Sequence, residues 1–254
     1  RSVGYSDRGV VTRYSGSTRY TIRNSLFRNV ESSSVVDESG DVENCTFTNL
    51  CIAYMCGRSQ NSFRNCLFTG ATNVTRVGNC KFDNCSFVAN FGGPALGSNS
   101  HSPAFTNCVF WANTPTTSDG YRGNMGLLVQ QKDFAATNRI AMANCVFQAS
   151  EETSKDAPNM CDADKSGASA ELTALAIARG PRFVDPVHGN WRLKHNSPLR
   201  DKALTLDWMT DEATDLDGNP RCLDMKGKQT ADALPDIGCY ECANPKPGIA
   251  ILVR

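Results

Sequence analysis

The sequence carries no excess of charge of either sign. Lys plus Arg and Asp plus Glu each number 26 among 254 residues, which gives a formal net charge of zero. A chain without net charge has no overall field that attracts nucleic acid or an anionic membrane surface. We therefore expect no nucleic-acid partner.

Long hydrophobic runs are also missing. The apolar tail GIAILV (248–253) is far shorter than the 18 or more apolar residues that a membrane-spanning helix needs. No signal peptide stands at the start and the chain opens on Arg1, which predicts a mature or excised fragment. We expect no membrane insertion by this segment.

Residues that carry catalysis are sparse in the first 150 positions. His101 is the only histidine there, and acidic residues are few. A lyase for acidic polysaccharides needs a Lys or Arg base and usually an acidic cluster that holds calcium, while a glycoside hydrolase needs two or three carboxylates in a groove. Neither set can be assembled from this region, which favours a non-catalytic protein.

What recurs instead is a six-residue phrase: an apolar residue, a spacer, Asn, Cys or Ser, a spacer and Phe. Its Phe stands at positions 27, 47, 68, 87, 110 and 147, so the gaps are 20, 21, 19, 23 and 37 residues. A period of about 20 to 23 built on short β-type phrases is that of one coil of a solenoid. The Leu lattice and the helical periodicity of leucine-rich repeats are absent, which disfavours that alternative.

The phrase itself predicts a corner. In VENCTF (42–47), Cys45 and Phe47 share one face of a strand, while Val42 lies three before Cys45 and breaks the alternation. A bend at Asn44 restores it, because Asn tolerates the left-handed conformation that a one-residue corner requires. Val42, Cys45 and Phe47 then all face inward. The predicted fold is all-β: a right-handed parallel β-helix with a C-terminal loop-rich cap.

Stacked coils place like residues over like at a spacing of roughly 4.8 Å. We therefore expect a ladder of Asn side chains, a column of Cys thiols and a column of Phe rings. The rings expected to form one internal column are Phe47, Phe68, Phe87 and Phe110.

Two places depart from the period. A tandem copy of the phrase ends at Phe82, and we expect it in the preceding strand of the same coil. The long gap before Phe147 predicts a loop in TPTTSDGYRGN (114–124), after which GLLVQQ (126–131) resumes as strand.

Three regions follow from these patterns. Residues 1–150 hold the repeats, 151–180 a polar loop with a short helix (169–180), and 181–254 a different module. An open solenoid end exposes strand edges and apolar side chains, so we expect this last module to cap it. The side chains expected over that end are Phe183, Trp191, Leu193, Ile237 and Tyr240.

The chain has twelve cysteines. Their one-per-coil spacing predicts that the cysteines of the phrase are small buried residues rather than metal or redox groups. These are Cys45, Cys66, Cys85, Cys108 and Cys145, with Cys80 in the tandem copy. Cys239 and Cys242 form a CxxC pair, a pattern of redox and zinc sites, but no second CxxC accompanies it. We favour instead a disulfide from Cys222 to Cys239 or Cys242.

The C-terminal region carries a set of motifs: PRFVDPVHGNWRLKHNSPLRDKA (181–203), DLDGNPR (215–221) and PDIGCYE (235–241). Together they resemble the C-terminal signature of bacterial choice-of-anchor Q domain proteins, with departures at Cys239, where Ala is usual, and Arg200, where Ile is usual. The repeats resemble the pectate-lyase-like superfamily and, more distantly, the passengers of chlamydial polymorphic outer-membrane proteins. These resemblances imply a secreted or bacterial surface protein with a right-handed parallel β-helix. They imply no single activity, since this fold hosts lyases, hydrolases, adhesins and stalks.

Two sets of residues are candidates for a site. The catalytic candidates are His101, Arg122 and Lys132. The calcium candidates are Asp215, Asp217 and Asn219. Arg122 and Lys132 fall within 114–133, and His101 lies in the loop GSNSHSP (97–103), where an exposed loop position is its simpler interpretation. The second set alternates as calcium ligands do but lacks the later bidentate Glu, so a structural turn is its simpler interpretation. No other cofactor is expected.

Two functions remain open. The first is a secreted or surface-displayed β-helical module, non-catalytic, with structural, adhesive or glycan-contacting roles. Its partners would be polysaccharide or other surface proteins, and its location extracellular or on the bacterial cell surface. The alternative is a polysaccharide lyase or glycoside hydrolase acting on an acidic polysaccharide. The missing catalytic set favours the first.

Overall fold

The computed structural model describes residues 19–36, 40–56, 61–71, 75–76, 79–90, 94–96, 103–113, 121–123, 128–130, 141–147, 180–223 and 233–242. The short helix expected over 169–180 lies outside these ranges except for its last residue. Within them, no helix has the length and apolarity that a bilayer crossing needs.

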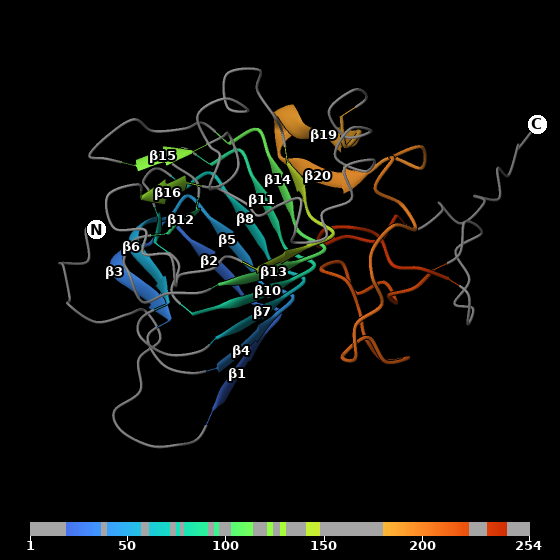
Figure 1. The fold of residues 1–254 in the computed structure, drawn as a ribbon, viewed down its shortest axis with the longest axis horizontal. Helices are drawn as coiled ribbons and strands as arrows, with labels where there is room; N and C mark the ends of the chain where they lie inside the picture. The colour runs from blue at the N-terminus through green and yellow to red at the C-terminus, as the bar shows by residue number, and fades with distance from the viewer. Residues whose placement is uncertain are drawn as a thin grey trace, which may run out of the picture.

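Three stacks of strands build the repeat region (Figure 1). Sheet 1 consists of β1 (Tyr20–Arg23), β4 (Gly40–Glu43), β7 (Ser62–Arg64), β10 (Lys81–Asp83), β13 (Ala104–Thr106) and β17 (Ala141–Ala143). Sheet 2 consists of β2 (Leu26–Arg28), β5 (Thr46–Thr48), β8 (Leu67–Thr69), β11 (Ser86–Val88), β14 (Val109–Trp111) and β18 (Val146–Phe147). Sheet 3 consists of β3 (Glu31–Val36), β6 (Cys51–Cys56), β9 (Thr75–Arg76), β12 (Pro94–Leu96), β16 (Leu128–Gln130) and β15 (Tyr121–Gly123).

We number the coils 1 to 6 from β1 to β17. Coils 1 to 5 run from sheet 1 to sheet 2 and then to sheet 3, and the described part of coil 6 runs from sheet 1 to sheet 2. Pairing within the stacks is parallel, apart from the antiparallel pair of β15 and β16. These two strands fall in the long gap before Phe147, where a loop followed by a strand was expected. The predicted parallel β-helix is confirmed.

The corners between sheets 1 and 2 are the Asn residues of the phrase. All six have left-handed backbone conformations, with φ between 50° and 54°. They are Asn24, Asn44, Asn65, Asn84, Asn107 and Asn144. The predicted one-residue corner is therefore confirmed in every coil. A second left-handed corner follows sheet 2, at Asn29, Asn49, Gly70, Ala89 and Ala112, and it was not predicted.

Two columns of side chains fill the interior. In sheet 2 the rings of Phe47, Phe68, Phe87 and Phe110 stack with centroid spacings of 4.8, 4.6 and 5.0 Å, as predicted. The two successive copies of the phrase, which end at Phe82 and Phe87, lie in β10 and β11 of one coil. Phe82 is therefore in sheet 1, also as predicted. The sheet 1 rings meet those of sheet 2 edge to face, at centroid distances of 5.3 to 6.1 Å. This interlocked arrangement is the geometry that aromatic pairs favour.

Five buried, free cysteines follow the Asn corners, one in each of coils 2 to 6. Each thiol lies near two backbone carbonyls, one two residues earlier and one in the preceding coil. For Cys66 these are the carbonyls of Arg64 at 3.2 Å and Val42 at 3.5 Å. In coil 1, Ser25 holds this place and its hydroxyl donates to the Arg23 carbonyl at 2.9 Å. The position therefore selects a small side chain with a weak donor. Cys80, which precedes sheet 1, is instead disulfide-bonded.

Alkylation of the native protein tests this arrangement. We expect rapid labelling of the half-buried Cys222 and Cys242, and labelling of the five corner cysteines only after unfolding, because the thiolate must be reachable to react. Mass spectrometry of peptides after timed exposure to iodoacetamide measures both rates. Rapid native labelling of Cys66 or Cys108 would contradict the burial of this row.

The C-terminal module consists of β19 (Phe183–Asp185), the 3₁₀ turn η3 (Pro186–His188), β20 (Asn190–Leu193) and irregular chain. It was expected over the open end of the last coil, and that expectation is wrong. The module lies along the flank of the β-helix, beside sheets 1 and 2 (Figure 1). Its contacts with the Asn corners run from coil 2 to coil 6.

The physical reason is an apolar strip on the outer face of sheet 2. The outward side chains of coils 3 to 6 include Leu67, Val88, Val109 and Val146, which are buried in one cluster with apolar side chains of the module. The module's buried members of that cluster are Phe183, Trp191, Leu193, Leu199, Ala203, Ile237, Cys239 and Tyr240. In coil 1 the corresponding Leu26 is 62% exposed. The module therefore leaves this position of coil 1 uncovered.

Candidate functional site: a buried charged cluster between module and coils

The Asn corners do more than turn the chain, because five of them donate a side-chain N–H to the module. The acceptors are Thr214 Oγ1 for Asn44 (3.1 Å) and the backbone carbonyls of Thr214 for Asn65 (2.7 Å), Asp236 for Asn84 (3.0 Å), Leu204 for Asn107 (2.9 Å) and Lys202 for Asn144 (2.7 Å). The module chain therefore follows the row of corners coil by coil.

These contacts modify the amide ladder expected from the sequence. Asn107 donates to Asn84 at 3.0 Å, and Asn144 donates to Asn107 at 2.9 Å, so the ladder exists in coils 4 to 6. At Asn65 the side-chain oxygen instead accepts from Arg221, a residue of the module. A charged donor forms a stronger hydrogen bond than a neutral amide, which explains why the ladder gives way there.

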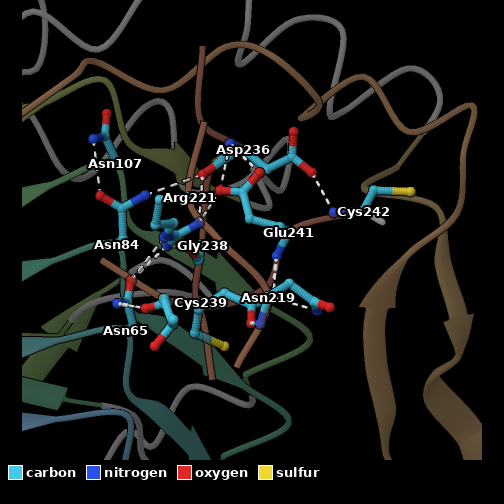
Figure 2. A network of polar contacts seen from close by, with 12 residues as sticks. Asn65, Asn84, Asn107, Asn219, Arg221, Asp236, Gly238, Cys239, Glu241 and Cys242 are labelled. Atoms are coloured by element: carbon cyan, nitrogen blue, oxygen red, sulfur yellow. Dashed lines mark hydrogen bonds and ion pairs between the residues drawn. The ribbon is translucent and has the colours of Figure 1, made fainter. Parts of the chain in front are cut away.

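Arg221 is the centre of the cluster (Figure 2) and is 1% exposed. Its Nε and Nη2 donate to Oδ1 of Asn65 at 3.1 and 2.6 Å. Nη2 also donates to the carbonyl of Gly238 at 2.7 Å, and Nη1 pairs with the carboxylate of Glu241. One guanidinium group thereby joins coil 3 to two separate parts of the module. The planar fork of five donors makes Arg suited to this role.

Three buried carboxyl groups surround this guanidinium: Asp215, Asp236 and Glu241. Both oxygens of Glu241 accept from the backbone N–H of Asp236, at 3.1 and 3.3 Å. Asp236 in turn accepts from the backbone N–H groups of Asp201 at 2.8 Å and Cys242 at 2.6 Å. The cluster is thus extensively hydrogen-bonded, as buried charges require.

Gly238 brings the module chain against sheet 2. Its φ is 100°, and a Cβ there would lie 2.8 Å from Oγ of Ser86 and 3.1 Å from Cγ2 of Val109. Its N–H donates to the Asn107 carbonyl at 3.0 Å, and the N–H of Cys239 donates to Oγ of Ser86 at 3.2 Å. This close approach explains why the segment PDIGCYE needs glycine at its centre.

One guanidinium group cannot neutralise three carboxylates, so the cluster retains protons above the usual range for carboxyl groups. Burial raises the pKa of Glu241 to about 8 and that of Asp236 to about 6, against the opposing attraction of Arg221. Burial also raises the pKa of Asp215. Each of these groups prefers its neutral form more strongly in the folded protein than in the unfolded chain.

A pH dependence of stability follows. Because the folded pKa values are raised, the folded protein binds more protons than the unfolded chain between about pH 4 and pH 8. The stability that these groups contribute is fully present below the unfolded pKa values and is lost as pH rises through about 6 and 8. We expect the free energy of unfolding to decrease between pH 5 and pH 8.5 by an amount on the order of 1–3 kcal/mol, and the thermal midpoint to fall with it. Melting curves across this pH range measure the change. Asp236→Asn should make the thermal midpoint less dependent on pH around pH 6. A midpoint that rises with pH would contradict this account.

The calcium candidates form a hydrogen-bonded turn. Oδ1 of Asp215 accepts from the N–H groups of Asp217 at 2.9 Å and Asn219 at 2.7 Å. Its Oδ2 accepts from the Asn219 side chain at 3.1 Å and from the N–H of Glu241 at 2.7 Å. Asp217 pairs with Arg192 through both oxygens. The carboxylate oxygens of Asp215 and Asp217 thus already accept N–H groups, and within the described ranges no three His, Cys, Asp or Glu side chains gather as metal ligands.

The catalytic candidates are not brought together by the described part of the chain. His101 and Lys132 lie outside the described residues. Arg122 has its backbone in β15, opposite Val129 of β16, and its side chain is likewise not described. The site that the structure does show is built from motif residues whose individual roles sequence reasoning missed. The signal was present, because DLDGNPR and PDIGCYE supply Asp215, Arg221, Asp236 and Glu241.

The favoured disulfide is a further correction. Cys222, Cys239 and Cys242 are all free. Cys239 is buried in the apolar cluster on the outer face of sheet 2, whereas Cys222 and Cys242 are half-buried. Hydrogen bonds around Arg221 tie the module's loops together in place of the expected bridge.

Comparison with known proteins agrees with the observed architecture. A family model described as a right handed beta helix region matches residues 8–159, more than half of the chain. Neither curated proteins nor solved structures yield a match. With its stacked parallel strands and this match, the chain belongs to the right-handed β-helix family.

Proposed function

We propose that this protein is a secreted or surface-displayed β-helical module without catalytic activity, with a structural, adhesive or glycan-contacting role. The observation that supports the proposal is the burial of charged residues between the module and the coils. Four charged residues of the C-terminal motifs are buried and hydrogen-bonded to one another and to the Asn corners: Asp215, Arg221, Asp236 and Glu241. They hold the module to the rod and are not presented to a substrate.

The ion pairs on the outer face of sheet 1 also support the proposal. Glu43 pairs across coils with Arg23 at 2.7 Å and with Arg64 at 3.0 Å. Within β10, Lys81 pairs with Asp83 at 3.2 Å. Such mutual pairing leaves the face near neutral and stiffens it. A rigid, neutral rod whose side is covered by its own C-terminal module suits display or contact better than binding of a highly charged substrate.

A glycan screen tests the proposal against the alternative of a lyase or hydrolase. Incubation of the full chain with uronate-containing polysaccharides should yield neither unsaturated products, read by ultraviolet absorbance, nor new reducing ends. Binding without turnover on a glycan array would support a contacting role. Turnover that is lost in Arg122→Ala, Lys132→Ala or His101→Ala would overturn the non-catalytic proposal and place the site near the β15–β16 pair.

A further inference from the structure

The cysteines that follow the Asn corners form a continuous row of thiols, one in each of coils 2 to 6. The residue after each cysteine donates its N–H to the carbonyl at the same position of the preceding coil, at 2.8 to 3.0 Å. The row is therefore stacked in register, and all five cysteines are free and buried. They are Cys45, Cys66, Cys85, Cys108 and Cys145.

The sulfur atoms of neighbouring coils lie next to each other. A side-chain contact with Cys66 is the largest cause of the raised pKa of the Cys45 thiol. The distance between coils is shown by the Phe rings, which stack at 4.6 to 5.0 Å in coils 2 to 5. Two thiolate–metal bonds of roughly 2.3 Å each, placed in line, span about 4.6 Å. An ion held in line between two sulfurs therefore matches the repeat of the coils.

The number of ligands selects the kind of ion. No group of three metal-ligating side chains is present in the part of the chain that the structure describes, which disfavours zinc, because structural zinc sites take four ligands. Soft thiolate ligands favour copper(I). Copper(I) and silver(I) both accept two sulfurs in a straight line. The surroundings are the apolar core of the coils, so the bound state must carry no net charge.

We propose that soft monovalent cations, copper(I) or silver(I), bind between successive thiols of this row in linear two-coordinate sites. An ion between two thiols releases one S–H proton to solvent, so one thiolate, one thiol and one cation are neutral together. Four ions between five sulfurs, with four protons released and one thiol kept, are neutral as well. Loss of the proton orphans no carbonyl in the example of Cys66, because the carbonyl of Arg64 also accepts from the N–H of Asn44 at 3.0 Å. The inference is independent of the proposed function.

The test uses silver(I) as the probe, because its oxidation state is stable in air. The full chain carrying Cys222→Ser and Cys242→Ser, which removes the two half-buried thiols, is incubated with silver nitrate in a chloride-free buffer. Urea below the unfolding transition lets the coils open locally, and a brief wash with a small thiol then removes loosely held ions. Native mass spectrometry counts the retained ions, and X-ray absorption at the silver edge should show two sulfur neighbours.

Two substitutions distinguish a row of shared sulfurs from separate thiols. Ser is the matched replacement, because Ser25 holds this position in coil 1. Cys85→Ser interrupts the row in the middle and should lower the retained count by two ions, whereas Cys145→Ser removes the last thiol and should lower it by one. Cys239→Ser, at a buried thiol outside the row, should leave the count unchanged.

A loss of one ion in both row variants would overturn the proposal, because it would show that each thiol binds by itself. So would the absence of retained silver in the parent protein. If a row variant does not fold, the sulfur coordination in the parent protein decides the matter: one sulfur neighbour, or three and more, would contradict a linear site between coils.

Discussion

Replacing Arg221 by Met is expected to lower the free energy of unfolding by about 3–5 kcal/mol. The change removes the charged partner of the buried Glu241 carboxyl group, and it leaves the oxygen of Asn65 and the carbonyl of Gly238 buried without this donor. A buried group that loses its partner costs its full desolvation penalty, and here three groups lose it together. Chemical denaturation followed by far-ultraviolet circular dichroism measures the loss.

The matched control is Arg192→Met. Arg192 also pairs with a carboxylate, that of Asp217, but its side chain is 47% exposed. Solvent screens such a pair, so we expect a loss of no more than about 1 kcal/mol. Equal losses for the two variants would show that burial of the Arg221 cluster contributes nothing special to the joint between module and coils.

Phe68→Ala is expected to lower the free energy of unfolding by roughly 3–5 kcal/mol, because it opens a cavity in the middle of the interior. The ring of Phe68 stacks on Phe47 at 4.8 Å and on Phe87 at 4.6 Å. Edge contacts with Phe63 at 5.8 Å and Phe82 at 6.0 Å complete its surroundings. Interiors packed this closely collapse only in part around a deleted side chain.

Phe27→Ala provides the comparison for this variant. Phe27 stacks on Phe47 at 4.8 Å in the same column, but it is only partly buried, since it belongs to coil 1. We expect a smaller loss there, because solvent already reaches part of the ring. Unfolding curves in urea for both variants measure the difference. A loss at Phe27 equal to or larger than that at Phe68 would contradict the single continuous column.

The repeat region could be predicted from sequence because each coil repeats the same local physics. Asn at a left-handed corner, a small residue after it and Phe two positions later recur with little variation, so one phrase such as VENCTF predicts the others. The displaced copy ending at Phe82 was also placed correctly, in the strand of sheet 1 that precedes the corner at Asn84.

The position of the module was missed although a signal was present. The spacer between Cys and Phe points outward, and it is Thr46 in coil 2 and Ser86 in coil 4 but Leu67, Val109 and Val146 in coils 3, 5 and 6. Apolar residues on an outward position predict a lateral cover. The module was predicted over the open end of the solenoid because strand edges are exposed there. The outward side chains of sheet 2 did not enter that prediction.

The cluster around Arg221 was missed for a different reason. Its residues are separated in sequence by up to 156 positions, as in the bond from Arg221 to Asn65. Single carboxylates and one Arg in turn motifs look alike whether they face solvent or the interior. Their burial follows only once the module is placed on the flank, because the row of corners then supplies the matching polar groups.

The central claim is that Arg221 joins the C-terminal module to the rod through the corner of coil 3. A double-mutant cycle between Asn65→Gly and Arg221→Met tests it most directly, since Gly keeps the left-handed corner and removes only the side chain. Asn24→Gly, at the exposed corner of coil 1, serves as the control partner. We predict a coupling of roughly 1–3 kcal/mol for the pair with Asn65 and less than about 0.5 kcal/mol for the pair with Asn24. Additive effects for Asn65 and Arg221 would contradict the claim.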